Sequence, residues 1–154
     1  MADTYTQIYI QIIFAVQNRN ALIQPIWEEE LYKYITGIVR NKGQKMLKIN
    51  GTPNHIHFFI GMKPTCLISD LVREVKKSSD EFIRKNKFTS FHFKWQEGFG
   101  AFSYSHTQIT DVIQYIEKQK THHTKQSFKE EYLAFLNDFK IEFKDEYLFE
   151  WIPD

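Results

Sequence analysis

Two histidines separated by a single residue, His55 and His57, have the spacing that most directly suggests chemistry in this sequence. The segment that holds them, 55–62 (HIHFFIGM), is apolar and aromatic and predicts a β-strand. Because side chains alternate across a strand, both imidazoles should point to one face, about 7 Å apart along the backbone. Neutral imidazole binds Mn, Zn, Ni and Co well and Mg tolerably, so the pair could hold a divalent cation. The alternative is that both are ordinary polar residues of a strand.

Tyr115 and Gln119 form a second candidate pair, in a segment whose apolar residues predict a helix. Residues four apart lie on the same helix face, one turn from each other. The amide oxygen of Gln119 could therefore supply a third metal ligand beside the phenol of Tyr115, and an activated phenol is a nucleophile. The alternative is that Tyr115, one of 8 tyrosines, only packs in the core. Tyr104 is the second candidate nucleophile, but its predicted strand position offers no matching ligand.

The remaining histidines are interpreted as residues without a direct role in chemistry. His122 and His123 directly follow the predicted tyrosine helix, where a cationic side chain favours the helix dipole. A position near DNA or near the metal is the alternative for this pair. His92 and His106 are isolated in the sequence, and we interpret them as structural.

Basic side chains gather in two stretches of the sequence. Arg73, Lys76 and Lys77 lie on a predicted helix, whereas Lys118 and Lys120 follow the candidate tyrosine. Such runs are usually a solvated helix face, but in a nucleic-acid-binding protein one of them should contact phosphates. The formal net charge of +1 does not decide between these readings, because total charge does not report how charge is distributed over faces.

Length and composition are typical of one globular domain, which we expect to span residues 1–154. The single cysteine, Cys66, excludes an internal disulfide and fits a reducing compartment. The N-terminal residues lack a basic stretch followed by an apolar one, so no secretory signal is expected. No apolar run approaches the roughly 20 residues that span a bilayer. The sequence therefore predicts a soluble, cytoplasmic protein that does not contact membranes.

The elements that must position the candidate residues alternate along the chain. Residues rich in β-branched and aromatic side chains predict strands at 6–16, 45–50, 55–62, 91–96 and 101–105. Helical spacing of apolar residues predicts helices at 27–43, 67–83, 109–116 and 128–138, the last begun by a capping box of Ser127 and Glu130. This order predicts an α+β fold, a ferredoxin-like two-layer sandwich. Its antiparallel sheet would have four to five strands with helices packed on one face. The other face would need a ligand, a partner or a second subunit to cover it.

With these elements in place, the sequence resembles the HUH single-tyrosine transposases, the small insertion-sequence transposases that act on single-stranded DNA, and their REP-associated relatives. The resemblance covers nearly the whole chain. The segments that carry it are TQIYIQIIFAVQNR, NHIHFFIGMKPT followed by ISDLVREVKKSS, FKWQEGFGAFSYS, and VIQYIEKQKTHH followed by SFKEEYLAFL.

The resemblance implies that His55, His57 and Gln119 bind a divalent metal, Mg or Mn, and that Tyr115 attacks a DNA phosphate. The product would be a 5′-phosphotyrosine and a free 3′-OH, and attack by such a hydroxyl on another phosphotyrosine would rejoin strands without ATP. It also implies single-stranded DNA with a hairpin as the partner, and a homodimer. In some members the tyrosine helix serves the histidine pair of the other subunit, so the site could form within one chain or between two.

Two other functions remain compatible with the sequence. One is a non-catalytic nucleic-acid-binding module on the same scaffold, with the histidines contacting nucleic acid. The other is a metal-dependent hydrolase in which water attacks instead of tyrosine. The joint presence of His55, His57, Tyr115 and Gln119 favours the transposase, because a binding module needs no nucleophile beside a metal. A covalent protein–DNA adduct would distinguish the transposase from both.

Overall fold

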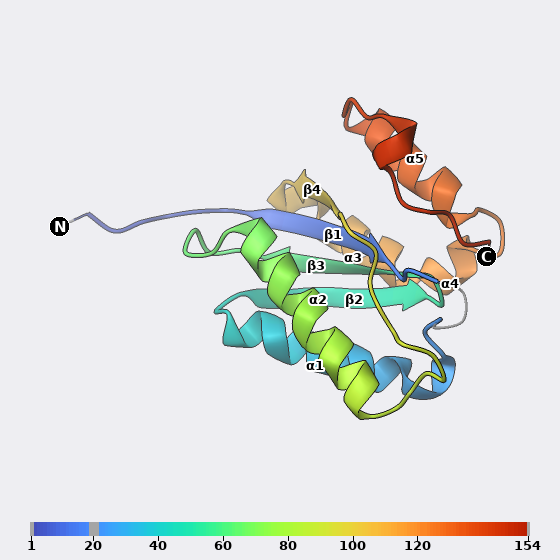
Figure 1. Cartoon of the computed structure of the whole chain (residues 1–154). Helices are drawn as coiled ribbons and strands as arrows, with labels where there is room; N and C mark the ends of the chain where they lie inside the picture. Colours follow the sequence, from blue (N-terminus) through green and yellow to red (C-terminus); the bar gives the residue numbers. More distant parts are fainter. Residues whose placement is uncertain (1, 19–21, 154) are drawn as a thin grey trace.

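The fold is a four-stranded antiparallel sheet with helices on both faces (Figure 1). The computed structural model describes residues 2–18 and 22–153. The strands are β1 Tyr9–Ala15, β2 Lys45–Thr52, β3 His55–Gly61 and β4 Gly100–Tyr104. They lie side by side in the order β2-β3-β1-β4, and each neighbouring pair is antiparallel. With α1 Pro25–Asn41 after β1 and α2 Ile68–Lys85 after β3, this is the connectivity of the expected ferredoxin-like α+β fold.

The main core lies between one face of the sheet and the pair α1 and α2. Pro25 begins α1, where its missing N–H costs no hydrogen bond, and Leu31 and Ile35 follow at helical spacing as buried residues. In α2 the buried residues Leu71 and Val75 repeat that spacing. Because side chains alternate along β3, residues such as Phe58 turn toward this core, whereas both candidate histidines turn to the opposite face.

The second face of the sheet is covered by the chain's own C-terminal helices, which differs from the open face that the sequence suggested. These helices are α3 Ile109–Glu117, α4 Gln119–His122 and α5 Phe128–Asp138. Phe59 of β3 packs there with Val112 and Ile116 in a second, smaller core. The candidate site therefore lies between the sheet and the helices of this face, not on an open sheet surface.

Two predicted elements differ from the structure. Residues 91–96 do not form a strand: Trp95 makes an isolated bridge to Val16, and its indole donates to Ser79 Oγ at 2.9 Å. The buried aromatic side chains there pack on the helices and on β1, and pairing with the sheet is limited to this single bridge. The predicted tyrosine helix is interrupted at Lys118, so that α3 ends at Glu117 and α4 begins at Gln119. Residues 109–122 contain neither Pro nor Gly, so the sequence has no residue that would predict this break.

The C-terminal residues return to the main body of the protein. Phe149 is buried, and its ring lies 5.7 Å from that of Phe128 and 6.1 Å from that of Trp151, centroid to centroid. Phe149 and Trp151 thus both pack against Phe128, whereas Tyr147 is 78% exposed. Within residues 2–18 and 22–153, no helix is both long and apolar enough to cross a membrane.

Candidate metal and nucleophile site

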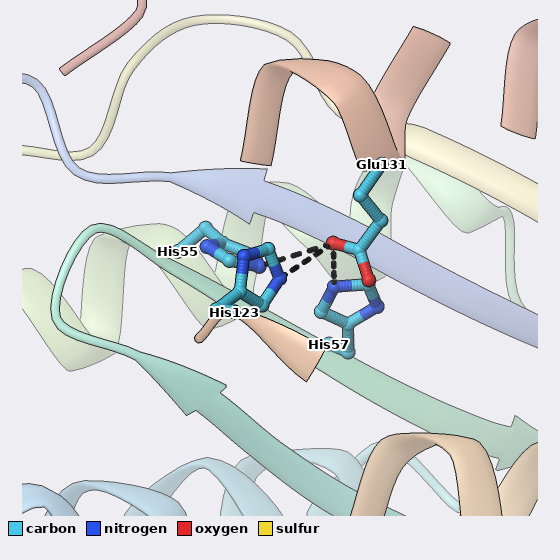
Figure 2. A group of neighbouring side chains, drawn as sticks. All are labelled: His55, His57, His123 and Glu131. Carbon is cyan, nitrogen blue, oxygen red and sulfur yellow. Dashed lines mark hydrogen bonds and ion pairs between the residues drawn. The ribbon is translucent and has the colours of Figure 1, made fainter. Parts of the chain in front are cut away.

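His55 and His57 lie at the start of β3, where both side chains are completely buried. Their neighbours in the sheet are β1 and β2, which pair with β3 on either side. The two rings are 5.0 Å apart, centroid to centroid. As the alternation along the strand predicts, they point to the same face, toward α5 (Figure 2).

Each of the two imidazoles is held at its Nδ1 atom by a side-chain oxygen. His57 Nδ1 lies 2.7 Å from Gln11 Oε1, and the Gln11 amide nitrogen donates to the Tyr104 hydroxyl at 2.8 Å. His55 Nδ1 lies 2.6 Å from Asn54 Oδ1. In the tautomer in which Nδ1 donates to these amide oxygens, Nε2 is left as the inward-facing ligand atom. Metal-binding histidines are typically oriented in this way by a second shell of acceptors.

Glu131 and His123 complete a cluster around the inward nitrogens. No role was expected for Glu131, and a position near the metal was only the alternative for His123. Glu131 Oε1 lies 3.0 Å from His57 Nε2, 3.3 Å from His55 Nε2 and 3.1 Å from His123 Nε2 (Figure 2). One ligand atom from each of the four residues lies within 4.8 Å of the others. For His123 the cluster therefore supports the alternative position, near the potential metal site.

The position of Glu131 on the apolar face of its helix is a sequence signal that could have identified it as a site residue. Phe128, Tyr132 and Phe135 mark the apolar stripe of α5 at spacings of four and three. Glu131 falls within that stripe and is 2% exposed. A carboxylate at a buried helix position is costly unless a partner compensates it, so such a position indicates a functional or ion-binding residue.

Tyr115 and Gln119 both reach the same carboxylate from α3 and α4. The Tyr115 hydroxyl donates to Glu131 Oε2. The Gln119 amide nitrogen donates to the same oxygen at 2.9 Å, and its Oε1 lies 3.3 Å from His55 Nε2. All four site residues expected from the sequence thus meet at one place within a single chain, even though the helix between Tyr115 and Gln119 is broken.

The electrostatics of the cluster favour a bound cation. Each imidazole of the pair faces an oxygen acceptor at both ring nitrogens, whereas a neutral imidazole has one proton. A second proton is disfavoured at His55, because burial lowers its pKa to about 4. Burial also opposes ionisation of Glu131, but the surrounding imidazoles outweigh it and hold the pKa of this carboxyl well below its usual range. A metal ion between the Nε2 atoms and the carboxylate would satisfy all of these groups.

Tyr115 lies beside a cavity of about 360 Å³ that gives access to the site. Gln11, Tyr104 and Glu131 also line it, together with the carboxylates of Asp111 and Asp138. The phenol is in its neutral form, because burial and the adjacent Glu131 carboxylate both raise the pKa of Tyr115. A phosphate that enters this acidic cavity needs a cation to offset the repulsion.

The other candidate residues lie around the site or away from it. Tyr104, the second candidate nucleophile, contacts Gln11 and has its pKa raised to about 12 by burial. The ring of His122 stacks on Tyr115 at 4.7 Å, centroid to centroid. His106 is exposed with its Nδ1 3.4 Å from the Tyr9 hydroxyl, and His92 is exposed as well.

The basic residues of α2 are on the face of the sheet opposite to the site. Lys76 stabilises the fold, because its ammonium donates to the carbonyl oxygens of Gln96 at 2.8 Å and Gly98 at 2.6 Å. Arg73 pairs with Asp70 at 3.0 Å, while Lys77 is exposed.

Lys118 and Lys120 lie on the face of the sheet that carries the site. Lys118 is exposed at the turn between α3 and α4. Lys120 donates to Asn50 Oδ1 at 2.8 Å and pairs with Glu28 at 3.2 Å.

A family profile described as IS200-like transposase matches residues 4–119, a segment that contains the histidine pair, Tyr115 and Gln119. The solved structures that share the fold include two transposases. A candidate transposase from Deinococcus radiodurans R1 is 18% identical and aligns over 77% of this chain and 95% of that chain, with a TM-score of 0.60. A REP-associated tyrosine transposase bound to a REP hairpin is 17% identical and aligns over 80% of this chain and 73% of that chain, with a TM-score of 0.59. Among curated proteins, none matches the sequence.

Proposed function

Because the chain belongs to the IS200-like transposase family, we propose that it cleaves and rejoins single-stranded DNA through a covalent bond to Tyr115. The observation that carries this proposal is the contact of the Tyr115 hydroxyl with Glu131, whose other oxygen faces the imidazole pair. A nucleophile next to a potential metal site is the arrangement that phosphodiester cleavage requires.

A divalent cation, Mg or Mn, would be held by His55, His57 and Gln119. The inward nitrogens of the histidines and the Gln119 amide oxygen lie close enough to share one ion, with Gln119 Oε1 3.3 Å from His55 Nε2. Such an ion supplies Lewis-acid neutralisation of charge on the phosphate. Gln11 and Asn54 keep both rings in the tautomer that offers Nε2.

The tyrosine reaction follows from the hydrogen bond that the phenol makes. As the bond from the Tyr115 oxygen to phosphorus forms, the phenol proton passes to Glu131 Oε2, its acceptor. The bond from phosphorus to the 3′ oxygen breaks, and that oxygen takes up a proton from solvent and leaves as a 3′-OH. A 5′-phosphotyrosine remains, and attack by a 3′-OH reverses the same bond changes and rejoins the strand.

The substrate we propose is single-stranded DNA with a hairpin. Support comes from the family and from the fold shared with a transposase that was solved with a REP hairpin. Among the basic residues, Lys118 and Lys120 are the best placed to contact phosphates, because they lie on the same face as Tyr115. Arg73, Lys76 and Lys77 are a second candidate contact surface, on the other side of the sheet.

A homodimer remains part of the proposal, but the chemistry does not require it. Tyr115, Gln119 and the histidine pair come together within one chain, which supports a site formed in cis. In that arrangement a second subunit would contribute to the pairing of two DNA ends, not to the reacting groups.

The test is covalent capture of DNA. The protein is incubated with a 3′-end-labelled single strand that carries a hairpin from its own genomic flanks, with Mn or Mg, and resolved under denaturing conditions. A labelled adduct is expected for the native protein and for Tyr104→Phe, and its loss is expected for Tyr115→Phe. An adduct that survives in Tyr115→Phe would assign the nucleophile elsewhere. Strand cleavage without any adduct would instead indicate a hydrolase.

A further inference from the structure

The C-terminal segment of the chain contributes two potential metal ligands that the family match does not include. That match ends at residue 119, whereas His123 follows α4 and Glu131 lies on α5. Both side chains are directed at the inward nitrogens of His55 and His57 (Figure 2). We propose that His123 and Glu131 complete a four-donor metal centre, of three imidazole nitrogens and one carboxylate oxygen, which binds a divalent transition metal before DNA arrives. This inference deepens the metal-binding part of the proposed function.

The first argument is the convergence of donor atoms on one point. Glu131 Oε1 lies 3.0 to 3.3 Å from the Nε2 atoms of all three histidines. The four ligand atoms all lie within 4.8 Å of one another, so modest side-chain shifts would bring each to a metal–ligand distance of about 2.0–2.2 Å. Gln119 remains adjacent as a fifth donor, since its Oε1 lies 3.3 Å from His55 Nε2.

The second argument is that Glu131 has no ion pair with a lysine or arginine among the residues that the structure describes. It is 2% exposed, and within residues 2–18 and 22–153 its ion pairs are all with histidines. A buried carboxylate needs a compensating cation. Where Asn54 and Gln11 accept the Nδ1–H protons of His55 and His57, the Nε2 atoms present lone pairs toward the carboxylate. A metal ion is the cation that accepts both kinds of ligand.

The third argument concerns which metal this donor set selects. Three imidazoles and one carboxylate favour Mn, Co, Ni or Zn, whereas Mg prefers oxygen ligands and retains several waters. The resemblance alone indicated Mg or Mn. The additional nitrogen of His123 shifts the expected preference toward the transition metals.

The site would also connect the C-terminal helices to the sheet. Glu131 bridges the proposed metal position through Oε1 and the Tyr115 hydroxyl through Oε2, so metal binding would position the carboxylate that accepts the tyrosine proton. The rings of His55 and Phe128, the first residue of α5, stack at 3.9 Å, centroid to centroid. Metal binding should therefore raise the thermal stability of the DNA-free protein.

The experiment is calorimetric titration of the chelator-treated, DNA-free protein with Mn, Co, Zn and Mg. We expect one site per chain and tighter binding of Zn, Co and Mn than of Mg. His123→Ala and Glu131→Gln should each weaken Zn binding at least tenfold. The matched controls are His92→Ala and Glu130→Gln, which change exposed residues and should leave Zn binding unchanged. Circular dichroism of each variant with chelator present controls for folding. Glu131→Asp is a second probe: it retains the carboxylate and should bind Zn more tightly than Glu131→Gln does.

Two outcomes would overturn the inference. If His55→Ala and Gln119→Ala weaken metal binding but folded His123→Ala and Glu131→Gln do not, the metal is held by the family-matched residues alone. If Mg binds as tightly as Zn to the native protein, the donor set lacks the third imidazole. Neither outcome affects the assignment of Tyr115, because the covalent adduct with DNA is measured independently.

Discussion

Tyr115 and Glu131 are joined by a hydrogen bond between the phenol hydroxyl and carboxylate oxygen Oε2, while the other oxygen of the same carboxylate lies 3.0 Å from His57 Nε2. One side chain therefore contacts both the candidate nucleophile and the candidate metal ligands. A change at Glu131 should affect tyrosine attack and metal binding together, and the two effects can be separated by measurement at saturating metal.

Glu131→Gln should slow formation of the tyrosine–DNA adduct even when Mn is saturating. Glutamine is similar in size but cannot take the phenol proton, and loss of a positioned proton acceptor typically costs about 10²- to 10⁴-fold in rate. Single-turnover kinetics with a labelled hairpin strand would measure this. Glu130→Gln, one residue away and exposed, is the matched control and should react at the native rate. Equal rates for Glu131→Gln and native protein would remove the carboxylate from the reaction.

Gln11→Leu should weaken metal binding without removing any ligand. The Gln11 side chain accepts from His57 Nδ1 at 2.7 Å and donates to the Tyr104 hydroxyl at 2.8 Å, which fixes the orientation of the His57 ring. Loss of such an orienting acceptor typically lowers metal affinity about 10- to 100-fold. Titration of the chelated variant with Mn or Zn measures the effect. Tyr104→Phe, which removes only the far end of this chain of hydrogen bonds, should have a smaller effect; the reverse order would contradict the orienting role of Gln11.

Gly51→Ala should disturb the start of β3 and with it the site. A Cβ at residue 51 would clash with the His55 carbonyl oxygen and lie 3.0 Å from Ile56 Cα, both backbone atoms of the neighbouring strand that cannot turn away. Overpacking of this kind costs about 1–3 kcal/mol, and the displaced strand carries His55. Thermal denaturation should show a lower Tm, and metal affinity should fall as well.

Gly37→Ala is the matched control for that change. Gly37 lies within α1. Apart from its chain neighbours and the backbone of its own helix, no atom of the described residues lies within 4 Å of the position that a Cβ would take. Alanine is the better helix former by about 0.8–1.0 kcal/mol, so this variant should be as stable as the native protein or more stable. A drop in Tm for Gly37→Ala comparable to that for Gly51→Ala would mean that the clash at β3 is not the cause.

Much of the fold could be predicted because local patterns report it directly. Strands β1 and β3 are dense in β-branched and aromatic residues, and α1 and α2 repeat apolar residues at helical spacing. Residues 91–96 show where such patterns mislead. Trp95 is buried by its contact with Ser79 and by rings such as Phe14, 4.9 Å away between centroids. Its apolar neighbourhood therefore resembles a strand, although it forms only an isolated bridge to Val16.

The site could be predicted only where its residues are close in sequence. His55 and His57 are two residues apart, so strand alternation alone places them on one face. Glu131 is 74 residues from His57, and only the packing of α5 on the sheet brings them together. His123 lies in a turn after α4, where local periodicity says nothing about direction. The sequence did not predict that α3, α4 and α5 cover the second face of the sheet for the same reason: this packing depends on contacts between residues that are far apart in the sequence.

Lys118→Gln should weaken DNA binding more than Lys77→Gln does. Both side chains are exposed, but Lys118 lies at the turn between the helix that carries Tyr115 and α4, whereas Lys77 is on α2, across the sheet from the site. A strand that reaches Tyr115 should bring its phosphates near the first lysine and not near the second. Loss of one phosphate contact reduces the slope of log affinity against log salt by about 1. Fluorescence anisotropy with a labelled hairpin strand, at several salt concentrations and in the Tyr115→Phe background to prevent cleavage, measures that slope. A reduced slope for Lys77→Gln with a native slope for Lys118→Gln would place the DNA on the α2 side and require another route to the tyrosine.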